Sequence, residues 1–402
     1  MEGLGVGLNI ASFEATPHPI TVQGPGLFSR EKEQRRWLVW FCALHVGRAR
    51  QEPRMKPIPA SLLALFLPIA TAQEPATQNQ KVARHSSEAG QPFAIAVLPD
   101  TQFYCDTRLK LSAKWGNGDL RRYFYAQTEW VRDNQERLNI AFLVHEGDLV
   151  QADAPEEWAI AKKAMSLLDG KVPYCMCLGN HDMGFEKADN KYGGNIGVNR
   201  TTLFNTYFPR EKFAQRREFG GTFDPDRHDN SWYHFEAAGM RFLIVSVECK
   251  PRDEVLKWAN QVVASHPDHR VIVLTHAYMK ADKSRNTGGM KAKGNTGEQT
   301  WQKFVKKHKN IFMVLCGHHT GEALREDVGD HGNVVHQILC DYQHLHNGGE
   351  SWLRYMVFDP AENEIRIHTY NPVLDKFKNG PSSRFNLVYP MMQSSAATLE
   401  LK

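Results

Sequence analysis

Five short apolar segments of the chain each end in a polar residue whose side chain can bind a metal ion. These residues are Asp100, Asp148, Asn180, His276 and His318. Apolar runs of about four to eight residues that are bounded by turn residues are typical of buried strands. In open α/β sheets, ligands bind beyond the carboxyl ends of the strands. The repeated arrangement therefore predicts one shared site at the edge of a sheet.

The predicted strands alternate with segments of helical spacing, so the fold class is predicted to be α/β. The predicted strands are residues 93–98, 140–144, 172–178, 232–235, 241–248, 271–274, 311–315, 334–339, 353–358 and 365–369. Helical patterns cover residues 120–138, 153–168, 252–265 and 298–308. Asp153 is expected to cap the second of these helices.

The composition is that of a soluble globular protein, with 402 residues of which 42% are hydrophobic and 23% are charged. The formal net charge of +4 is too even to favour nucleic acid or a membrane surface as the main partner. The seven cysteines are scattered, apart from Cys175 and Cys177, and most of them lie in apolar runs. Buried free thiols are therefore expected, and a disulfide among them is the alternative.

Residues 55–72 contain the three parts of a secretory signal peptide in the required order. A basic start at Lys56 is followed by the apolar run 58–69 and by small residues at 70–72, directly before Gln73. We therefore expect export, as a secreted or periplasmic protein with no stable membrane anchor after cleavage. An uncleaved anchor and a stray apolar segment are the alternatives.

The place of this signal divides the chain into four predicted parts. Translation is expected to start at Met55, which would make residues 1–54 a non-native or disordered extension. The signal peptide follows, and residues 73–90 are predicted to be a flexible lead-in. Residues 91–390 are predicted to form the functional domain.

The strand-end residues combine carboxylate, amide and imidazole donors. Such a mixed set suits two divalent transition-metal ions such as Mn, Zn or Fe, rather than Ca or Mg alone. A carboxylate such as Asp148 can bridge two ions that lie about 4 Å apart. A pair of ions can bind a phosphoryl group, lower the pKa of a bound water and stabilise charge on the attacking and leaving oxygens.

Four motifs follow one another in a recognisable order: Gly147-Asp148, Gly179-Asn180-His181-Asp182, Thr275-His276 and Gly317-His318. Together they resemble the motif set of the calcineurin-like metallophosphoesterase family, over roughly residues 93–320. The resemblance implies a four-layer fold, in which two mixed β-sheets pack as a sandwich that is flanked by helices. It also implies a metal-dependent hydrolase that acts on a phosphomonoester or a phosphodiester of a small molecule or a polymer.

The resemblance assigns a role to each matching residue. Asp148 would bridge the two ions, and Asp100 would bind the second of them. The first ion would be completed by Asn180, His276 and His318. In the same family pattern, a metal-bound hydroxide attacks phosphorus in line.

The residues next to Asn180 would act on the substrate. By the same resemblance, His181 would face the substrate and protonate or stabilise the leaving group. Asp182 would orient the ring of His181.

Two departures from the family pattern fall on the site to which Asp100 belongs. Gln102 stands where the family usually has a histidine ligand, and its side-chain oxygen is a weaker candidate ligand. Thr320 stands where the last motif usually has a second histidine. The second ion is therefore expected to bind more weakly or more selectively, and His319 and His344 are candidates for the missing ligands.

The same departures motivate an alternative function, in which a degenerate family member binds metal or a phosphorylated ligand without turnover. The intact run of residues 180–182 argues against it, because a non-catalytic protein has little need of the acid.

Each candidate residue alone has a more common structural role. A single Asp after a strand is usually a cap or a turn residue, and a single His is often packed in a core. The order of the motifs favours the metal site. Substrate specificity is expected to lie in residues 102–118, 183–230 and 280–297, of which the last is predicted to be a mobile surface loop.

Overall fold

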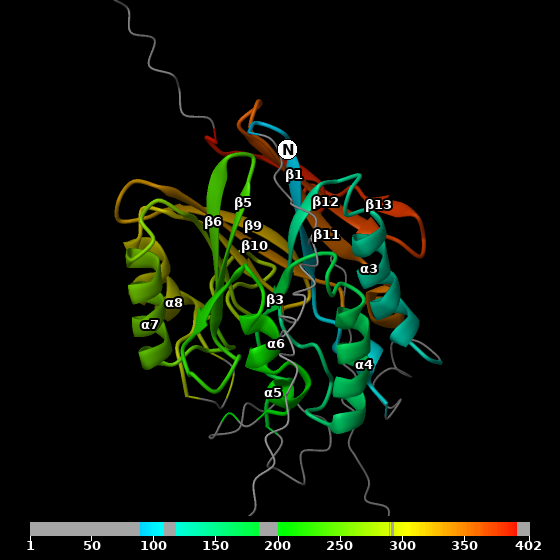
Figure 1. Ribbon diagram of the computed structural model, residues 1–402. Coiled ribbons are helices and arrows are strands. Elements are labelled where there is room, and N and C mark those ends of the chain that lie inside the picture. The colour runs from blue at the N-terminus through cyan, green and yellow to red at the C-terminus, as the bar shows by residue number, and fades with distance from the viewer. Residues whose placement is uncertain are drawn as a thin grey trace, which may run out of the picture. The chain divides into compact units, whose positions relative to one another are not determined.

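The computed structural model describes residues 89–107, 118–184, 200, 202–288, 290 and 293–391 (Figure 1). All of these residues belong to the compact unit Thr77–Lys402. The predictions made for residues 1–54, for the signal peptide and for nearly all of the lead-in lie outside the described residues. Among the helices of the described part, none is long and apolar enough to cross a membrane.

One seven-stranded sheet, sheet A, has the strand order β13-β12-β11-β1-β2-β3, with β14 paired to β12. Its strands are β1 (Phe93–Leu98), β2 (Ile140–His145), β3 (Tyr174–Met176), β11 (Leu353–Asp359), β12 (Glu364–Asn371), β13 (Lys376–Lys378) and β14 (Phe385–Val388). The neighbours β1, β2 and β3 run parallel, whereas the other pairs are antiparallel. Sheet A is therefore mixed.

The other seven-stranded sheet, sheet B, has the order β4-β5-β6-β7-β8-β10-β9. Its strands are β4 (Phe219–Thr222), β5 (Ser231–Ala237), β6 (Met240–Ser246), β7 (Arg270–Leu274), β8 (Ile311–Cys316), β9 (Gly321–Val328) and β10 (Val334–Asp341). The central strands β6, β7, β8 and β10 are parallel, and the outer pairs are antiparallel. The parallel strands of both sheets carry the predicted site residues at their ends.

Helices flank the two sheets. They are α1 (Gln102–Cys105), α3 (Arg121–Asp133), α4 (Pro155–Ser166), α5 (Phe204–Tyr207), α6 (Arg210–Ala214), α7 (Asp253–Ala264) and α8 (Gly297–Lys303), with the 3-10 helices η1 (Val305–Lys307) and η2 (His346–Gly349). In Figure 1, α3 and α4 lie on one side of the molecule, and α7 and α8 lie on the other. The predicted arrangement of two mixed sheets with flanking helices is confirmed.

The core lies between the sheets and under the helices, because the central strands are apolar on both faces. All six residues of β1 are buried, as are all six of β2 and of β8. Between the sheets, the ring of Phe93 in β1 lies 5.4 Å from that of Phe242 in β6, and Phe142 in β2 lies 5.2 Å from Phe235 in β5. Each such aromatic pair contributes about 0.5–1.5 kcal/mol beyond its buried area.

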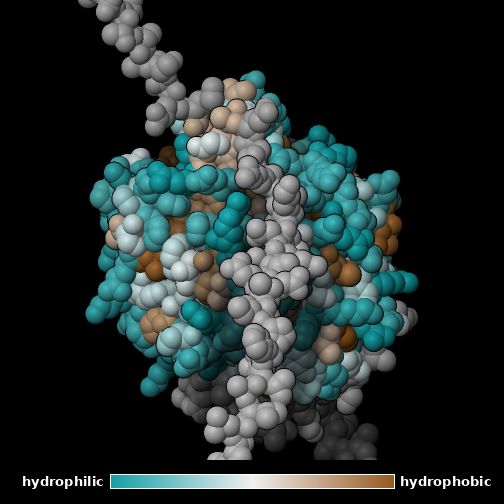
Figure 2. Space-filling view, viewed as in Figure 1, coloured by the Kyte–Doolittle hydropathy of each residue, from teal (hydrophilic) through white to brown (hydrophobic). Residues whose placement is uncertain are grey.

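The visible part of the surface is mostly hydrophilic, with apolar residues scattered over it (Figure 2). The six cysteines of the described part are buried and free, as predicted. Cys42 lies outside the described residues.

One local prediction was wrong. The cap of α4 is Ala154, because the Asp153 carboxylate instead accepts hydrogen bonds from Trp158 Nε1 at 2.7 Å and from Leu203 N at 2.9 Å. The segment 280–297 was predicted to be a mobile surface loop, and its described residues are partly exposed and partly buried. Arg285 there is 7% exposed, and its guanidinium is paired with acidic side chains of α8 and β9.

Candidate metal centre

The structure brings strand-end residues of both sheets together at one edge. Asp100 and Asp148 follow β1 and β2, which are parallel neighbours in sheet A. His276 and His318 follow β7 and β8, which are parallel neighbours in sheet B. Two contacts join the pairs: His276 Nε2 lies 3.2 Å from Asp148 Oδ2, and His318 N–H donates to Asp100 Oδ1 at 3.1 Å.

Three of these side chains form a compact donor group. One ligand atom each of Asp148, His276 and His318 lies within 4.8 Å of the other two. The rings of the two histidines are 5.0 Å apart. Asp148 and His276 are fully buried, and His318 is half-buried. A carboxylate and two imidazoles at this spacing match the ligands and the size of a transition-metal site.

Sharp backbone turns place these donors. Asp148 has a φ of 49° and His318 a φ of 71°, so both lie in the left-handed region that costs a non-glycine residue about 1–3 kcal/mol. The glycines before the ligands allow close packing. A Cβ atom on Gly179 would lie 2.0 Å from Asp148 Oδ1, and one on Gly317 would lie 2.1 Å from Asp100 Oδ1.

Hydrogen bonds fix the imidazole of His276 for metal binding. Its Nδ1–H donates to the carbonyl oxygen of Glu146 at 2.8 Å, which leaves Nε2 to face Asp148. In the described part of the structure, neither His276 Nε2 nor Asp148 Oδ2 has a hydrogen-bond partner apart from this mutual contact. Buried polar atoms of this kind are costly unless a partner satisfies them, and a cation between them would do so.

The charge states suit a divalent ion. Burial opposes ionisation of Asp148, but the neighbouring histidines, His276 first, hold the pKa of its carboxyl below the ordinary value. Burial, and then the charge of His276, lowers the pKa of His318 to about 2, so its imidazole is neutral. Burial disfavours a charge on His276, yet Asp148 raises the pKa of that imidazole. A metal ion would therefore displace a proton from the Asp148–His276 pair, and the donor set fits a divalent ion.

Asn180 and His181 lie directly against Asp148. The backbone N–H of His181 donates to Asp148 Oδ1 at 2.8 Å, and Asn180, which is 5% exposed, stands between this residue and Gly179. The His181 ring is half-buried, and its Nδ1–H donates to the carbonyl oxygen of Gln151 at 2.9 Å. The other ring nitrogen is then the one available to a substrate.

The predicted role of Asp182 needs correction. Both of its carboxylate oxygens accept backbone N–H groups, from Gly179 at 2.8 Å and from Val150 at 3.1 Å. The ring of His181 is instead oriented by the Gln151 carbonyl. Burial, and then the charge of Asp148, raises the pKa of Asp182 to about 8. Asp182 therefore ties the loop after β2 to the loop after β3.

His145 joins the loops after β1 and β2. Its Nδ1 accepts from Gly147 N at 3.2 Å, so Nε2–H donates to Thr101 Oγ1 at 3.0 Å. Burial, and then His276, lowers the pKa of His145 to about 3, which keeps the ring neutral. Its position fits support of the site and not metal ligation.

The surroundings of Asp100 differ from the prediction. Its carboxylate accepts from the His318 backbone at 3.1 and 3.2 Å and lies outside the compact donor group. Gln102 on α1 is buried and donates to the side chain of Gln343. His344 is exposed and contacts Thr320 and the ring of Phe103.

His319 is half-buried beside His318, with ring centres 4.5 Å apart. The residues that do lie beside Asp100 are Asp341 and Gln343 at the end of β10. Sequence reasoning overlooked both, although they follow an apolar run as the other site residues do.

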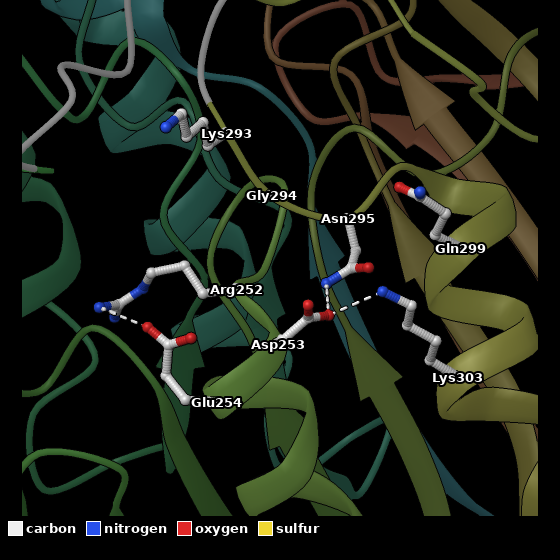
Figure 3. Close-up of a pocket in the computed structure, with 8 residues that line it drawn as sticks. All are labelled: Arg252, Asp253, Glu254, Lys293, Gly294, Asn295, Gln299 and Lys303. Atoms are coloured by element: carbon white, nitrogen blue, oxygen red, sulfur yellow. Dashed lines mark hydrogen bonds and ion pairs between the residues drawn. The ribbon is translucent and has the colours of Figure 1, made fainter.

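A pocket of about 300 Å³ lies elsewhere, at the start of α7 and α8 (Figure 3). Its charges pair with one another: Asp253 Oδ1 accepts from Lys303 at 2.8 Å and from Asn295 at 3.0 Å, and Arg252 lies 3.4 Å from Glu254. The metal centre is therefore the stronger candidate for a functional site.

The sequence profile described as calcineurin-like phosphoesterase matches residues 93–320, which include all of the strand-end residues. The chain belongs to the calcineurin-like phosphoesterase family. Proteins of this family are metal-dependent phosphoesterases, which supports the predicted class of hydrolase at a general level.

One relative of this family member is the uncharacterized protein YvnB of Bacillus subtilis (strain 168), which is 31% identical over 293 residues. The match covers 71% of this chain and 20% of YvnB, so the chain spans about a fifth of that relative's length.

Two solved structures are similar to this family member. The purple acid phosphatase PPD1 from yellow lupin (Lupinus luteus) seeds is 14% identical with a TM-score of 0.45, over 76% of this chain and 55% of that chain. A dimetal phosphatase from Danio rerio is 15% identical with a TM-score of 0.45, over 74% of this chain and 99% of that chain.

Proposed function

We propose that this chain hydrolyses a phosphomonoester or a phosphodiester of a small molecule or a polymer, in a metal-dependent reaction outside the cytoplasm. The observation that carries the proposal is the donor group of Asp148, His276 and His318 directly beside His181. The family supports the class of reaction, and residues 55–72 support export.

Divalent ions, when bound, would polarise the phosphoryl oxygens and lower the pKa of a water. The protein residues supply the rest. The Asp148 carboxylate and the imidazoles of His276 and His318 would hold the ion, with the side-chain oxygen of Asn180 beside them. A substrate phosphoryl group bound there would lie close to His181, since that residue contacts Asp148 through its backbone.

His181 would act on the leaving oxygen. Its Nδ1–H bond to the Gln151 carbonyl fixes the ring, which leaves Nε2 to carry the proton that the leaving oxygen accepts. A proton delivered in this way avoids an alkoxide leaving group, and general acid catalysis of this kind contributes about 10²–10⁴-fold to the rate.

The test uses protein stripped of metal and reloaded with Zn, Mn or Fe, with aryl phosphate mono- and diesters as substrates. We expect turnover with at least one ion, and a fall in kcat of about 10²–10⁴-fold in His181→Ala without loss of bound metal. His331→Ala is the matched control, because His331 is exposed and contacts only the Lys307 carbonyl among the interactions of the described residues. Bound metal without turnover under any condition would support the alternative of a binding protein without catalysis.

Export is tested separately by N-terminal sequencing of protein recovered from outside the cytoplasm. A mature chain that begins near Gln73 is expected. A chain that retains residues before Met55 would contradict both the signal peptide and the proposed start of translation.

A further inference from the structure

The space beside Asp100 contains an unusual concentration of buried carboxylates. Asp100, Asp341 and Glu146 are 2%, 1% and 0% exposed and come from the ends of β1, β10 and β2. In the described part of the chain, no lysine or arginine forms an ion pair with any of the three. Buried carboxylates are normally paired or bound to a metal, so a compensating group is expected here.

The amide of Gln343 lies among these carboxylates. Its Nε2 is 2.8 Å from Asp341 Oδ2, 3.4 Å from Asp100 Oδ2 and 3.3 Å from the carbonyl oxygen of His318. Three oxygens from three strand ends therefore converge on a single point. A modest contraction of these distances would surround a cation at that point, because oxygen ligands of Mn²⁺ and Mg²⁺ lie at about 2.0–2.2 Å.

Gln102 is a second, independent indication of a ligand. Its side chain is 3% exposed and its Nε2 donates to the Gln343 amide, whereas its Oε1 has no hydrogen-bond partner within the described residues. The oxygen and nitrogen of an amide exchange places by a half-turn that leaves its shape unchanged. Such a turn of Gln343 would direct its Oε1 at the convergence point and its Nε2 at Gln102. The Gln102 amide, turned in the same way, would accept that N–H, which would give its Oε1 the partner that it lacks.

We propose that Asp100, Asp341 and Gln343, with Gln102 fixing the amide of Gln343, form an all-oxygen site for a hard divalent cation such as Mn²⁺ or Mg²⁺. Carboxylate and carbonyl oxygens suit these ions, whereas the neighbouring group with two imidazoles suits Zn²⁺ or Fe²⁺. The two metal positions then differ in kind, because this position has lost nitrogen ligands and has gained oxygen ligands from the end of β10. The proposal rests on the metal centre of the proposed function, but its test measures metal binding and not turnover.

The test begins with metal-free protein that receives one equivalent of Zn²⁺ and then an excess of Mn²⁺. Elemental analysis after dialysis is expected to find one Zn and one Mn per chain. Asp341→Asn and Gln343→Ala should weaken Mn²⁺ binding by about tenfold or more in calorimetry and keep the Zn²⁺. His276→Ala should weaken Zn²⁺ binding and keep the Mn²⁺.

Two gain-of-binding variants keep the proposal testable if a loss variant fails to fold. Gln343→Glu should tighten Mn²⁺ binding, since it adds a charged oxygen ligand, and Gln102→His should allow a second Zn²⁺ to bind. Gln302→Ala is the matched control, because Gln302 is an exposed glutamine on α8 that contacts Glu298. Wild-type protein that binds one ion under every condition would overturn the proposal. Two Zn²⁺ ions bound equally tightly, or Mn²⁺ binding that neither Asp341→Asn nor Gln343→Ala affects, would do the same.

Discussion

At the scale of the residue, Asp148 contributes to the metal centre through its backbone and through both of its carboxylate oxygens. Its left-handed backbone makes the turn after β2, its Oδ1 accepts the His181 N–H, and its Oδ2 faces His276. Such a residue tolerates little movement, because a shift that relieves one contact breaks another. The space left for it by Gly179 is therefore part of the site.

Gly179→Ala tests this tight packing. The added Cβ would lie 2.0 Å from Asp148 Oδ1 and 2.3 Å from Asp148 N, so the ligand must move. We expect Zn²⁺ affinity to fall by about tenfold or more, and the free energy of unfolding to fall by about 1–3 kcal/mol. Calorimetric metal titration and denaturant unfolding measure the two effects. Gly288→Ala is the control, because a Cβ there has no neighbour within 4 Å; equal behaviour of the two variants would contradict the argument.

The motif residues could be predicted from the sequence because each follows a strand of continuous apolar residues. Asp341 ends such a strand and Gln343 follows it, but neither belongs to the four motifs, and only the contacts of Gln343 with Asp100 and Asp341 show their place. The contact partner of His181 could not be predicted either. It is the backbone carbonyl of Gln151. Every residue has a backbone carbonyl, so the sequence does not indicate which one accepts this hydrogen bond.

At the scale of the element, predictions were good where burial was complete. The strands β1, β2, β7 and β8 were placed to within one residue, since strands covered on both faces are apolar throughout. The strand β9 was missed because its sequence, GEALREDV, carries four charged residues and one of its faces is solvated. The short strands β13 and β14 were missed for a related reason: they lie at the margin of sheet A and bury few side chains.

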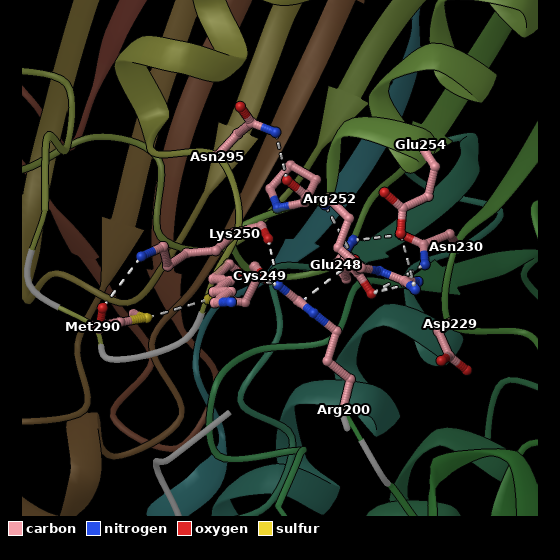
Figure 4. A network of polar contacts seen from close by, with 12 residues as sticks. Arg200, Asp229, Asn230, Glu248, Cys249, Lys250, Arg252, Glu254, Met290 and Asn295 are labelled. Atoms are coloured by element: carbon pink, nitrogen blue, oxygen red, sulfur yellow. Dashed lines mark hydrogen bonds and ion pairs between the residues drawn. The ribbon is translucent and has the colours of Figure 1, made fainter. Parts of the chain in front are cut away.

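Arg200 joins elements that are distant in the sequence (Figure 4). Its guanidinium donates to the carbonyl oxygens of Cys249 at 2.9 Å and of Lys250 at 2.7 Å, after β6, and to that of Lys293, before α8. It also lies 3.4 Å from the buried Glu248 carboxylate. This loop approaches the metal centre, because Cys249 N–H donates to the Leu178 carbonyl at the end of β3.

Arg200→Lys should loosen this junction, because an ammonium cannot reproduce the planar fork of donors. We expect the free energy of unfolding to fall by about 1–3 kcal/mol, with faster hydrogen exchange at residues 249, 250 and 293–295. Exchange followed by mass spectrometry measures the local effect. Arg217→Lys, at a side chain that is 71% exposed, is the control; unchanged exchange in Arg200→Lys would show that the junction does not depend on the guanidinium.

At the scale of the whole molecule, a buried ionic network behind the metal centre joins the two sheets. Glu322 on β9 of sheet B lies 2.8 Å from Arg354 on β11 and 2.7 Å from Lys378 on β13, both in sheet A. Arg354 is fully buried and also donates to Leu339 O at 3.4 Å, on β10. Removal of one partner of a buried pair leaves the other uncompensated, at a cost of about 3–5 kcal/mol.

Glu322→Gln should therefore lower the free energy of unfolding at neutral pH by about 3–5 kcal/mol. The pH dependence of the free energy of unfolding shows whether the charge of Glu322 causes this loss. Burial alone would raise the pKa of Glu322, but Arg354 and the hydrogen-bond donors around it lower the pKa from 4.5 to about 2. A carboxyl whose pKa is depressed by folding contributes stability above pH 4.5 and loses it as the pH falls through the folded value.

Wild-type protein should thus lose more stability than Glu322→Gln between about pH 4.5 and pH 2, and the two unfolding curves should converge toward the acid limit. Denaturant unfolding at a series of pH values measures this difference. Glu362→Gln, at an exposed residue that forms no ion pair within the described part of the chain, should follow the wild type within about 0.5 kcal/mol. A constant gap between wild type and Glu322→Gln at every pH would mean that packing, and not the charge of Glu322, links the two sheets.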